Sequence, residues 1–360
     1  MVSRQRRWYR SRQVTESAEL PRRIALIAPL WYPIAPDRGG IEQVVFLLAR
    51  ELVARGHEVT LVASADSTAP GRLVPVSAQG IVAAMEAKRA EEYSYYEAAA
   101  IAQTLRLAGE VDLVHSHLSG SLVPFSSLLP VPVLHTMHCP VAKDISWLAA
   151  RYPEAHLTAV SRHLADSLTG GARIAVVWNG IDMAAFRPCT EPDDYLLFLG
   201  RIERGKGVQV AIEVAQAVGL PLVLAGNATD REFFKRAIAG RDPRRVRFVG
   251  PVGGEDKVEL LRKAKALLFP ALQEETFGLV LVEAMACGTP VVALRRGAVA
   301  EIVTPGVNGF YATDTDELPA LVERVGEIDR GGVRASVVEP FSHQHMVDAY
   351  LALYRELCAR

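Results

Sequence analysis

The chain has 360 residues, of which 50% are apolar and 22% charged, and its formal net charge is -1. This length exceeds one compact core and suits two domains of ordinary size. The balanced charge excludes a global field that would attract nucleic acid or a membrane, so any such attraction must come from a local patch.

One local basic patch precedes the first apolar run. Residues 1–13, MVSRQRRWYRSRQ, carry five arginines before the first acid, Glu16. We expect residues 1–21 to form a basic, disordered, solvated tail. Two alternatives stay open: peripheral contact with anionic lipid at the inner membrane face, to which each basic residue contributes about 1 kcal/mol, and a transit peptide. No apolar segment suits a secretory signal or a membrane span.

The cysteines are widely spaced and form no C-x-x-C pattern; they are Cys139, Cys189, Cys287 and Cys358. This spacing favours neither a disulfide framework nor a zinc site. We therefore expect free thiols in a reducing cytoplasm.

Short apolar runs alternate with helical patterns through the first half of the chain. The run RRIALIAPL at 22–30 predicts a buried strand, and apolar residues at helical spacing over 41–55 predict a helix that Gly56 ends. Further strands are expected at 57–64, 111–117, 131–138, 157–161 and 174–180. Strands that alternate with helices predict a parallel sheet covered on both faces.

The same pattern restarts after residue 194. Strands are expected at 195–200, 221–226, 245–250, 266–271 and 290–294, with a helix over 207–219. We predict an α/β protein with two Rossmann-like, doubly wound domains that face a cleft: 22–187 on the acceptor side and 188–340 on the nucleotide-sugar side. Residues 341–360 are expected to form a final helix. Ligands of such sheets bind beyond the carboxyl ends of the strands.

The segment from Gly200 to Lys206 fits the phosphate-loop pattern G-x-x-x-x-G-K, but Gly207 stands where Ser or Thr should hold Mg²⁺. This argues against a nucleotide-hydrolysing loop. Arg201 and Lys206 still place a planar fork and a point charge at a strand end before a helix, where they can neutralise a diphosphate. The alternative is a solvated turn with two exposed cations.

A second signal lies in PALQEETFGLVLVEAMACGTPVVAL at 270–294, where Glu275 and Glu283 are eight positions apart. We expect a helix that begins near Phe277 and Gly278, with free amides at Gly278 and Leu279. A diphosphate at that helix end would face the two cations. Glu283 would accept hydrogen bonds from ribose hydroxyls and Glu275 from sugar hydroxyls; the alternatives are a helix-capping and a surface carboxylate.

Together, GRIERGKG and ETFGLVLVEAMACGTPVVA resemble the family-four retaining glycosyltransferases of GT-B fold. The segments GGIEQVVFLLARELVARGHEVTLV, DLVHSH, PVLHTMH, TAVSRHLADSL and WNGIDMAAFRP resemble further landmarks of that family, in the same order. The resemblance covers nearly all of the chain after the basic tail. It also implies that the final helix crosses back to pack on the first domain.

The resemblance implies four catalytic residues. Arg201 and Lys206 match the basic pair on the donor diphosphate, and Glu275 matches the glutamate near the donor hexose. His138 matches the histidine near the reaction centre; His135 in the same HTMH segment is the alternative, and His138 is preferred because it stands at the strand end. The implied donor-binding residues are Gly39, Gly40, Val252, Phe277, Gly278, Leu279 and Glu283.

No metal site is expected. His115 and His117 alternate on one strand and can face the same way, but no third ligand with suitable spacing accompanies them. We expect no cofactor and no bound metal, and we expect cationic side chains of the protein to neutralise the donor diphosphate instead.

The resemblance implies transfer of a hexose from a UDP- or GDP-sugar to an acceptor hydroxyl with retention of configuration. Two alternatives stay open: a nucleotide-sugar epimerase of the same fold and a non-catalytic nucleotide-sugar-binding protein. A nicotinamide enzyme is disfavoured because G-x-G-x-x-G is absent after the first strands. The acceptor is left open among lipid-linked sugars, glycans and small natural products. Tyr93, Tyr95 and Tyr96 are either sugar platforms or parts of a packed helix.

Overall fold

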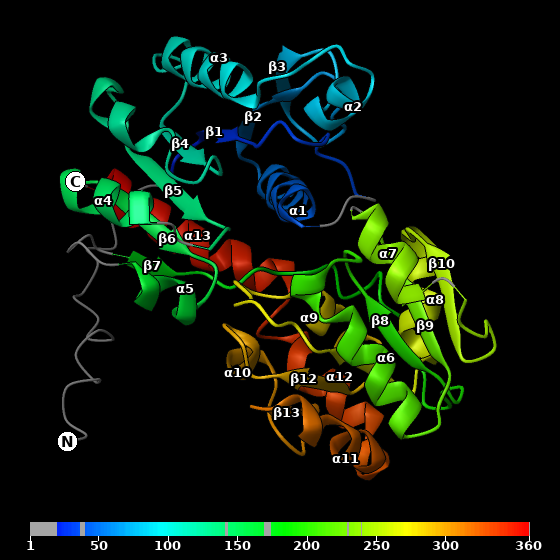
Figure 1. Ribbon diagram of the computed structural model, residues 1–360. Helices are drawn as coiled ribbons and strands as arrows, with labels where there is room; N and C mark the ends of the chain where they lie inside the picture. The colour runs from blue at the N-terminus through cyan, green and yellow to red at the C-terminus, as the bar shows by residue number, and fades with distance from the viewer. Residues whose placement is uncertain are drawn as a thin grey trace.

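The computed structural model describes residues 20–36, 40–140, 143–168, 174–228, 230–238 and 240–359. Most of the basic tail, residues 1–19, and the predicted donor residue Gly39 lie outside the described residues. The described chain forms two parallel sheets, each covered by helices, in two domains (Figure 1). The prediction of two Rossmann-like α/β domains is confirmed.

The first sheet has seven strands in the order β3-β2-β1-β4-β5-β6-β7, all parallel. Its strands are β1 (Arg23–Ile27), β2 (Glu58–Ser64), β3 (Arg72–Ser77), β4 (Leu113–Ser116), β5 (Val133–Met137), β6 (His156–Ala159) and β7 (Ile174–Val176). The chain order reverses at β1, so the loops after β1 and β4 open at the point where such sheets bind ligands.

Helices cover this sheet because their apolar residues recur at helical spacing. In α1, Val44, Val45, Leu48 and Leu52 are buried against the strands, and Gly56, with φ of 89°, follows its end. The helices are α1 (Ile41–Ala54), α2 (Ile81–Glu86), α3 (Tyr93–Arg106), η1 (Val123–Leu128), α4 (Lys143–Arg151) and α5 (Arg162–Ser167).

The second sheet has six parallel strands in the order β10-β9-β8-β11-β12-β13. Its strands are β8 (Leu196–Leu199), β9 (Leu222–Ala225), β10 (Val246–Gly250), β11 (Ala266–Phe269), β12 (Val291–Leu294) and β13 (Gly309–Ala312). The order reverses at β8, so the loops after β8 and β11 stand at the second switch point.

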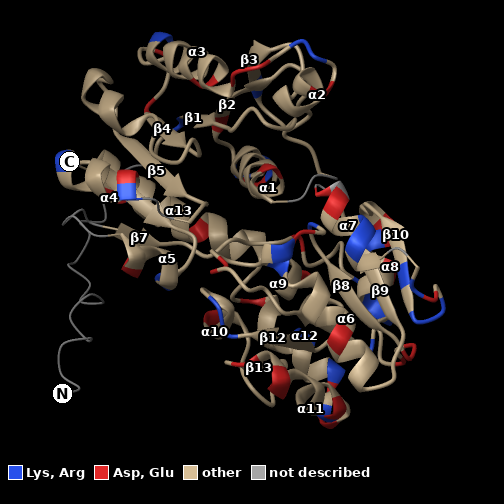
Figure 2. Cartoon of the chain, in the orientation of Figure 1, with Lys and Arg blue, Asp and Glu red and all other residues tan. Residues whose placement is uncertain are grey.

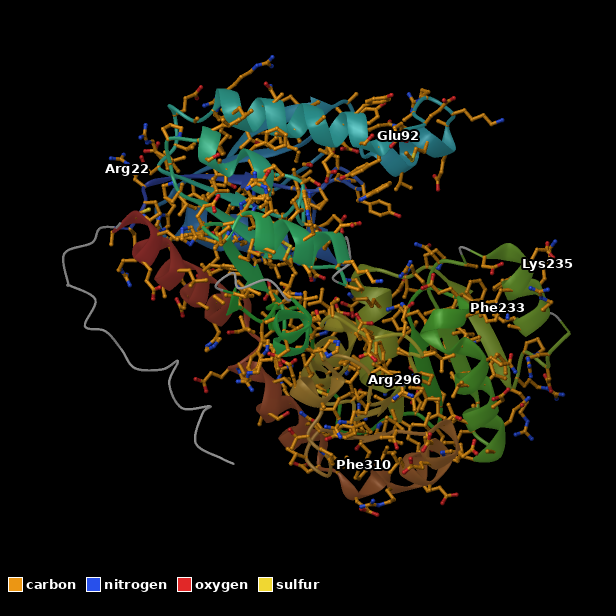
Figure 3. All side chains as sticks on the ribbon, turned by 60° about the vertical axis from the view of Figure 1, so that its left-hand side comes forward. Arg22, Glu92, Phe233, Lys235, Arg296 and Phe310 are labelled. Atoms are coloured by element: carbon orange, nitrogen blue, oxygen red, sulfur yellow. The ribbon has the colours of Figure 1, made fainter. Side chains whose placement is uncertain are left out.

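The second domain carries helices on both faces of its sheet. They are η2 (Arg204–Lys206), α6 (Val208–Ala217), α7 (Arg231–Ile238), α8 (Gly254–Lys263), α9 (Leu279–Ala286), α10 (Val299–Ile302), η3 (Thr315–Glu317), α11 (Leu318–Glu323), η4 (Arg324–Glu327) and α12 (Arg330–Val338). Figure 3 shows the arrangement from a second side, with Glu92 on the first domain and Phe233 and Lys235 on the second.

The last helix, α13 (His343–Cys358), runs back across the first domain (Figure 1, red). Met346, Val347, Tyr350 and Tyr354 are buried in the core that α1 and β1 also form. The helix predicted for the end of the chain therefore packs on the first domain in this structure, because its apolar side needs a partner.

Two strands were not predicted from the sequence. β3 is a partly exposed edge strand that contains Pro75, and proline is tolerated there because an edge strand leaves one side unpaired. β13 is also an edge strand, and its sequence GFYA begins with glycine and contains a polar tyrosine hydroxyl. Neither segment is the uninterrupted aliphatic run typical of the buried central strands.

Candidate functional site

The loop that resembles a phosphate loop lies between β8 and α6. Gly207 has a φ of 76°, and a Cβ built on it would lie 1.8 Å from the carbonyl oxygen of Pro270. No side chain fits there, so a serine or threonine that holds magnesium is excluded at this position. Residues 204–206 instead form the short 3-10 turn η2 directly before α6.

Arg201 follows β8 at its carboxyl end. Its guanidinium lies 3.2 Å from a carboxylate oxygen of Glu203, and its side chain is 57% exposed. Burial raises the pKa of the Cys139 thiol on the first domain, and the positive charge of Arg201 opposes that rise. Arg201 therefore stands across the domain boundary from the residue after His138.

Lys206 is less exposed than Arg201 and is paired with a largely buried carboxylate. Its ammonium lies 2.7 Å from a carboxylate oxygen of Glu275, and both side chains are largely buried. The loops that carry them are joined, because the amide of Leu272 donates to the carbonyl of Gly205 at 2.9 Å. The structure thus brings together two of the predicted residues as a direct ion pair.

The helix α9 begins beside this ion pair. Gly278 is its N-terminal cap residue with φ of 89°, and the first amides of a helix have no acceptor within the helix. The carbonyl of Glu275 accepts a 2.8 Å hydrogen bond from the amide of Ala298, which fixes the preceding loop. Leu279 packs against apolar residues of both domains. The amino end of α9 therefore lies at the domain boundary.

Glu283 lies inside α9 and is 4% exposed. Its carboxylate meets the ammonium of Lys257, from α8, at 2.7 Å. Sequence reasoning missed Lys257, because pairing between two helices depends on how they pack. The surface-carboxylate alternative for Glu283 is wrong, since the side chain is buried.

Three of the predicted donor-binding residues differ in how far they are exposed to a ligand. The side chain of Phe277 is buried and packs edge-on against Phe341 with ring centroids 5.9 Å apart, so only its backbone remains available to a ligand. Val252 is half-buried after β10. Gly40 caps α1 with φ of 74° and is exposed.

His138 lies at the end of β5 and is buried. Its Nε2 is 2.9 Å from Nδ1 of His117, which follows β4. Burial lowers the pKa of His138 to about 3, so the ring is neutral at neutral pH. His135 lies deeper in the same strand, where Nε2 meets the hydroxyl of Ser126 at 2.8 Å. His138 therefore lies nearer the strand end than His135, and its place near the reaction centre stays a prediction.

His115 belongs to a different network. Its Nδ1 lies 2.6 Å from the hydroxyl of Tyr354, and its Nε2 lies 2.7 Å from the hydroxyl of Thr136. Within the described residues, no group of three or more His, Cys, Asp or Glu side chains is arranged to hold a metal ion. Both ring nitrogens of His115 thus have other hydrogen-bond partners. His117 pairs with His138 through Nδ1, and its buried Nε2 has no hydrogen-bond partner among the described residues.

The three tyrosines at the start of α3 have three different environments. Tyr93 stacks on Trp31 with ring centroids 3.8 Å apart, and its hydroxyl accepts the amide hydrogen of Leu30. Tyr96 packs against the first-domain core, whereas Tyr95 is exposed. From α3, Tyr93 therefore contacts the loop after β1, at the ligand edge of the sheet.

Glu301 was also missed. From α10 in the second domain, its carboxylate accepts hydrogen bonds from the amides of Arg162 and His163, at 2.9 and 2.7 Å, and from the indole of Trp178 at 3.1 Å. It therefore caps α5 of the first domain. No sequence pattern pairs residues so far apart.

His343 is a buried histidine. Its Nε2 lies 3.4 Å from Glu51 and 3.2 Å from the guanidinium of Arg50. It begins α13, where the chain returns to the first domain, so its neighbours come from another element.

Figure 2 shows lysine and arginine residues in and near α7, β9 and β10. The side chains of Lys235, Arg236, Arg244 and Arg245 are exposed, and Arg244 pairs with Asp242. We assign them no role in the site. No helix in the described part of the chain is long and apolar enough to cross a membrane.

The two-domain fold and the charged residues at the carboxyl edge of the second sheet define a class of protein: two-domain α/β enzymes of GT-B type. Residues 38–185 match the family model described as Glycosyltransferase Family 4, and residues 185–329 match the one described as Glycosyl transferases group 1. The D-inositol 3-phosphate glycosyltransferase of Mycolicibacterium smegmatis is 30% identical, over 93% of this chain and 91% of that protein.

Solved structures agree with this class. AviGT4, a glycosyltransferase involved in avilamycin A biosynthesis, has a TM-score of 0.73 and 29% identity, over 95% of this chain and 98% of that one. HepE from Anabaena in complex with UDP-glucose has a TM-score of 0.70 and 19% identity, over 92% and 98% of the two chains, which shows the shared fold. The chain belongs to the family-four glycosyltransferases of GT-B fold.

Proposed function

We propose that this glycosyltransferase moves a hexose from a UDP- or GDP-sugar to an acceptor hydroxyl, with retention of configuration and without a metal ion. One observation carries the proposal. Arg201, the ion pair of Lys206 with Glu275, and the amino end of α9 gather at the carboxyl edge of the second sheet, beside the first domain.

The chemical requirement is stabilisation of the leaving group. The bond between the anomeric carbon and a β-phosphate oxygen breaks, and its electrons remain on the phosphate. Arg201, Lys206 and the free amides at Gly278 and Leu279 provide positive charge for that phosphate. Fixed groups of this kind act strongly because they need not reorganise during the reaction.

Glu275 has two tasks in this proposal. It holds the ammonium of Lys206 in place before the donor binds, at 2.7 Å, and then accepts hydrogen bonds from the hexose hydroxyls. His138 faces the sugar from the first domain as a neutral ring. Glu283 binds the donor ribose.

The epimerase and the non-catalytic binding protein remain the alternatives, and the products separate them. A glycosyltransferase consumes the nucleotide sugar only when an acceptor takes the hexose, apart from slow hydrolysis. An epimerase converts one nucleotide sugar into another without an acceptor. A binding protein leaves the sugar unchanged.

The first experiment is a thermal-shift panel of UDP, GDP and their hexose derivatives, with UDP-glucose tested first because a structural neighbour binds it. A ligand of the folded protein raises the unfolding temperature by mass action. The responding donor is then incubated with D-inositol 3-phosphate, a glycan and a lipid-linked sugar, with and without EDTA. Glycosylated product whose formation survives EDTA supports the proposal, whereas abolition by EDTA contradicts metal independence.

Substitution of Arg201 provides a residue-level prediction. Arg201→Ala should lower kcat by at least about tenfold, since loss of one preorganised group typically costs on the order of 3 kcal/mol of transition-state stabilisation. The fold should persist because the side chain is mostly exposed. Arg244→Ala, which removes another exposed arginine of the same domain, is the control and should retain full turnover. Normal turnover in Arg201→Ala would contradict the diphosphate assignment.

A further inference from the structure

The ion pair between Lys257 and Glu283 differs from surface pairs of the second domain. The Lys257 side chain is 17% exposed and the Glu283 side chain 5%, with 2.7 Å between ammonium and carboxylate. The pair of Lys265 with Asp194 has a similar separation of 2.8 Å but exposures of 35% and 81%. Only the first pair therefore carries the desolvation cost of two charges removed from water.

The position of Glu283 increases that cost. It lies in the second half of α9, near the end where the helix dipole is negative, and its neighbours Val282 and Ala284 are apolar and buried. A carboxylate there is unfavourable for stability alone. An apolar side chain would pack at this position more easily, so the carboxylate points to use by a ligand.

The contacts of Lys257 leave part of the carboxylate for another partner. The ammonium lies 2.7 Å from Oε1 of Glu283 and also stands over the ring of Phe186, 5.5 Å from its centroid. The structure records no hydrogen bond from a described residue to Oε2 of Glu283. Lys257 thus holds Oε1 of Glu283 in place. Because the carboxylate is rigid, Oε2 is then also held in a fixed orientation.

Lys257 also lies close in the sequence to Val252, the predicted donor-binding residue that the family resemblance places where the nucleobase packs. It lies in the first half of α8, five positions after Val252. A residue there can connect base binding to ribose binding, because α8 and α9 pack against one another.

We propose that Lys257 is a positioning residue that sets the preference for ribonucleotide over deoxyribonucleotide donors. It acts through Glu283, whose free oxygen then accepts hydrogen bonds from the ribose hydroxyls of a nucleoside diphosphate. This inference rests on the proposed function, and Lys257 itself touches no reacting atom.

Calorimetric titration with UDP, 2′-deoxy-UDP and 3′-deoxy-UDP tests the inference, or with the guanosine series if the wild type prefers GDP. In the wild type at least one deoxy compound should bind about tenfold more weakly, because it lacks a hydrogen bond to a charged group. Lys257→Met should weaken UDP binding to about that level and change the deoxy compound little. The ratio between the two affinities should therefore fall towards one.

Three further variants make the result specific. Lys257→Arg, which keeps the charge, should recover part of the ratio. Adding Lys257→Met to Glu283→Gln should weaken UDP binding no further, since both act through one contact. Lys265→Met removes the exposed lysine of the comparison pair and should leave the ratio unchanged. If Lys257→Met does not fold, Lys257→Gln replaces it in every comparison.

The outcomes separate the two proposals. A wild-type protein that binds no nucleoside diphosphate overturns the proposed function and this inference with it. Wild-type discrimination that persists in a folded Lys257 variant overturns the inference alone. A lower unfolding temperature with an unchanged affinity ratio would likewise show that Lys257 is only structural.

Discussion

Gly207 lies where the loop after β8 meets the end of β11. Its left-handed backbone and the carbonyl of Pro270 leave no volume for a side chain. The same contact brings the loop that carries Lys206 towards the loop that carries Glu275. At the scale of single residues, this glycine places a cation, although it has no functional group of its own.

Substitution at Gly207 should therefore be severe. A left-handed conformation alone costs an L-residue about 1–2 kcal/mol. Gly207→Ala should lower the free energy of unfolding by more than this amount, because the new Cβ also meets a backbone oxygen. Gly219→Ala is the matched control, with φ of 72° and nothing within 4 Å of its Cβ. Urea unfolding of both variants measures the difference, and equal losses would contradict a steric role for Pro270.

Helix α13 connects the two domains at the scale of elements. Its tyrosine hydroxyls enter a buried network in the first sheet, where Thr136 meets Thr158 at 2.6 Å and Tyr350 at 3.2 Å. Tyr354 meets His115 in the same region. The helix is thus held by specific polar contacts as well as by apolar burial.

Removal of one hydroxyl tests this attachment. Tyr354→Phe leaves Nδ1 of His115 without its buried partner and should destabilise the protein by about 1–3 kcal/mol. Chemical unfolding followed by circular dichroism measures the change. Tyr95→Phe alters an exposed tyrosine of α3 and should have little effect. A similar small effect in Tyr354→Phe would show that apolar packing alone holds α13.

The buried histidines of β4 and β5 make the first domain sensitive to acid. Burial lowers the pKa of His135 and of His138 to about 3, well below the ordinary value of 6.5. The unfolded chain therefore binds protons that the folded chain does not below pH 6.5. Their stabilising effect is fully present above pH 6.5 and is lost as the pH falls towards 3.

Unfolding measured between pH 8 and pH 5 should show a decline that begins near pH 6.5. Each such histidine contributes a slope of about 1.4 kcal/mol per pH unit. His135→Gln should reduce the slope by about 1.4 kcal/mol per pH unit, the contribution of one proton. A flat profile in the wild type would contradict neutral buried rings.

At the scale of the whole molecule, the two domains are joined by polar contacts on residues far apart in the chain. Glu301 caps α5 across the boundary and also accepts from the indole of Trp178. Its carboxylate receives three hydrogen bonds from the first domain. It therefore helps to set how the two carboxyl edges face each other.

Glu301→Ala should loosen this contact. The loss of hydrogen bonds to a charged acceptor should lower stability by about 1.5–3 kcal/mol, and small-angle scattering should show a larger radius of gyration. The tryptophan emission should also shift to longer wavelength as Trp178 loses its partner. Glu317→Ala, in a helix cap within the second domain, is the control and should not change the scattering. Unaltered scattering in Glu301→Ala would exclude a role in domain orientation.

Local patterns predicted most of the central strands, because buried parallel strands are short apolar runs that end in polar residues. The helix over 41–55 and the final helix were also predicted from their apolar spacing. β3 and β13 were not, since edge strands need fewer apolar residues. In the candidate site, Arg201, Lys206, Glu275, Glu283 and His138 were chosen from motifs, whereas Lys257 and Glu301 have no local signal.

The sequence by itself determined the alternation of strands and helices, hence the two parallel sheets, and the residue types that gather at strand ends. Only the tertiary structure decided which charges meet: Lys206 with Glu275, Lys257 with Glu283, and Glu301 with the start of α5. Periodicity along the chain reports which face of an element is buried. The contacts between elements depend on packing and crossover, which bring together residues that no local pattern relates.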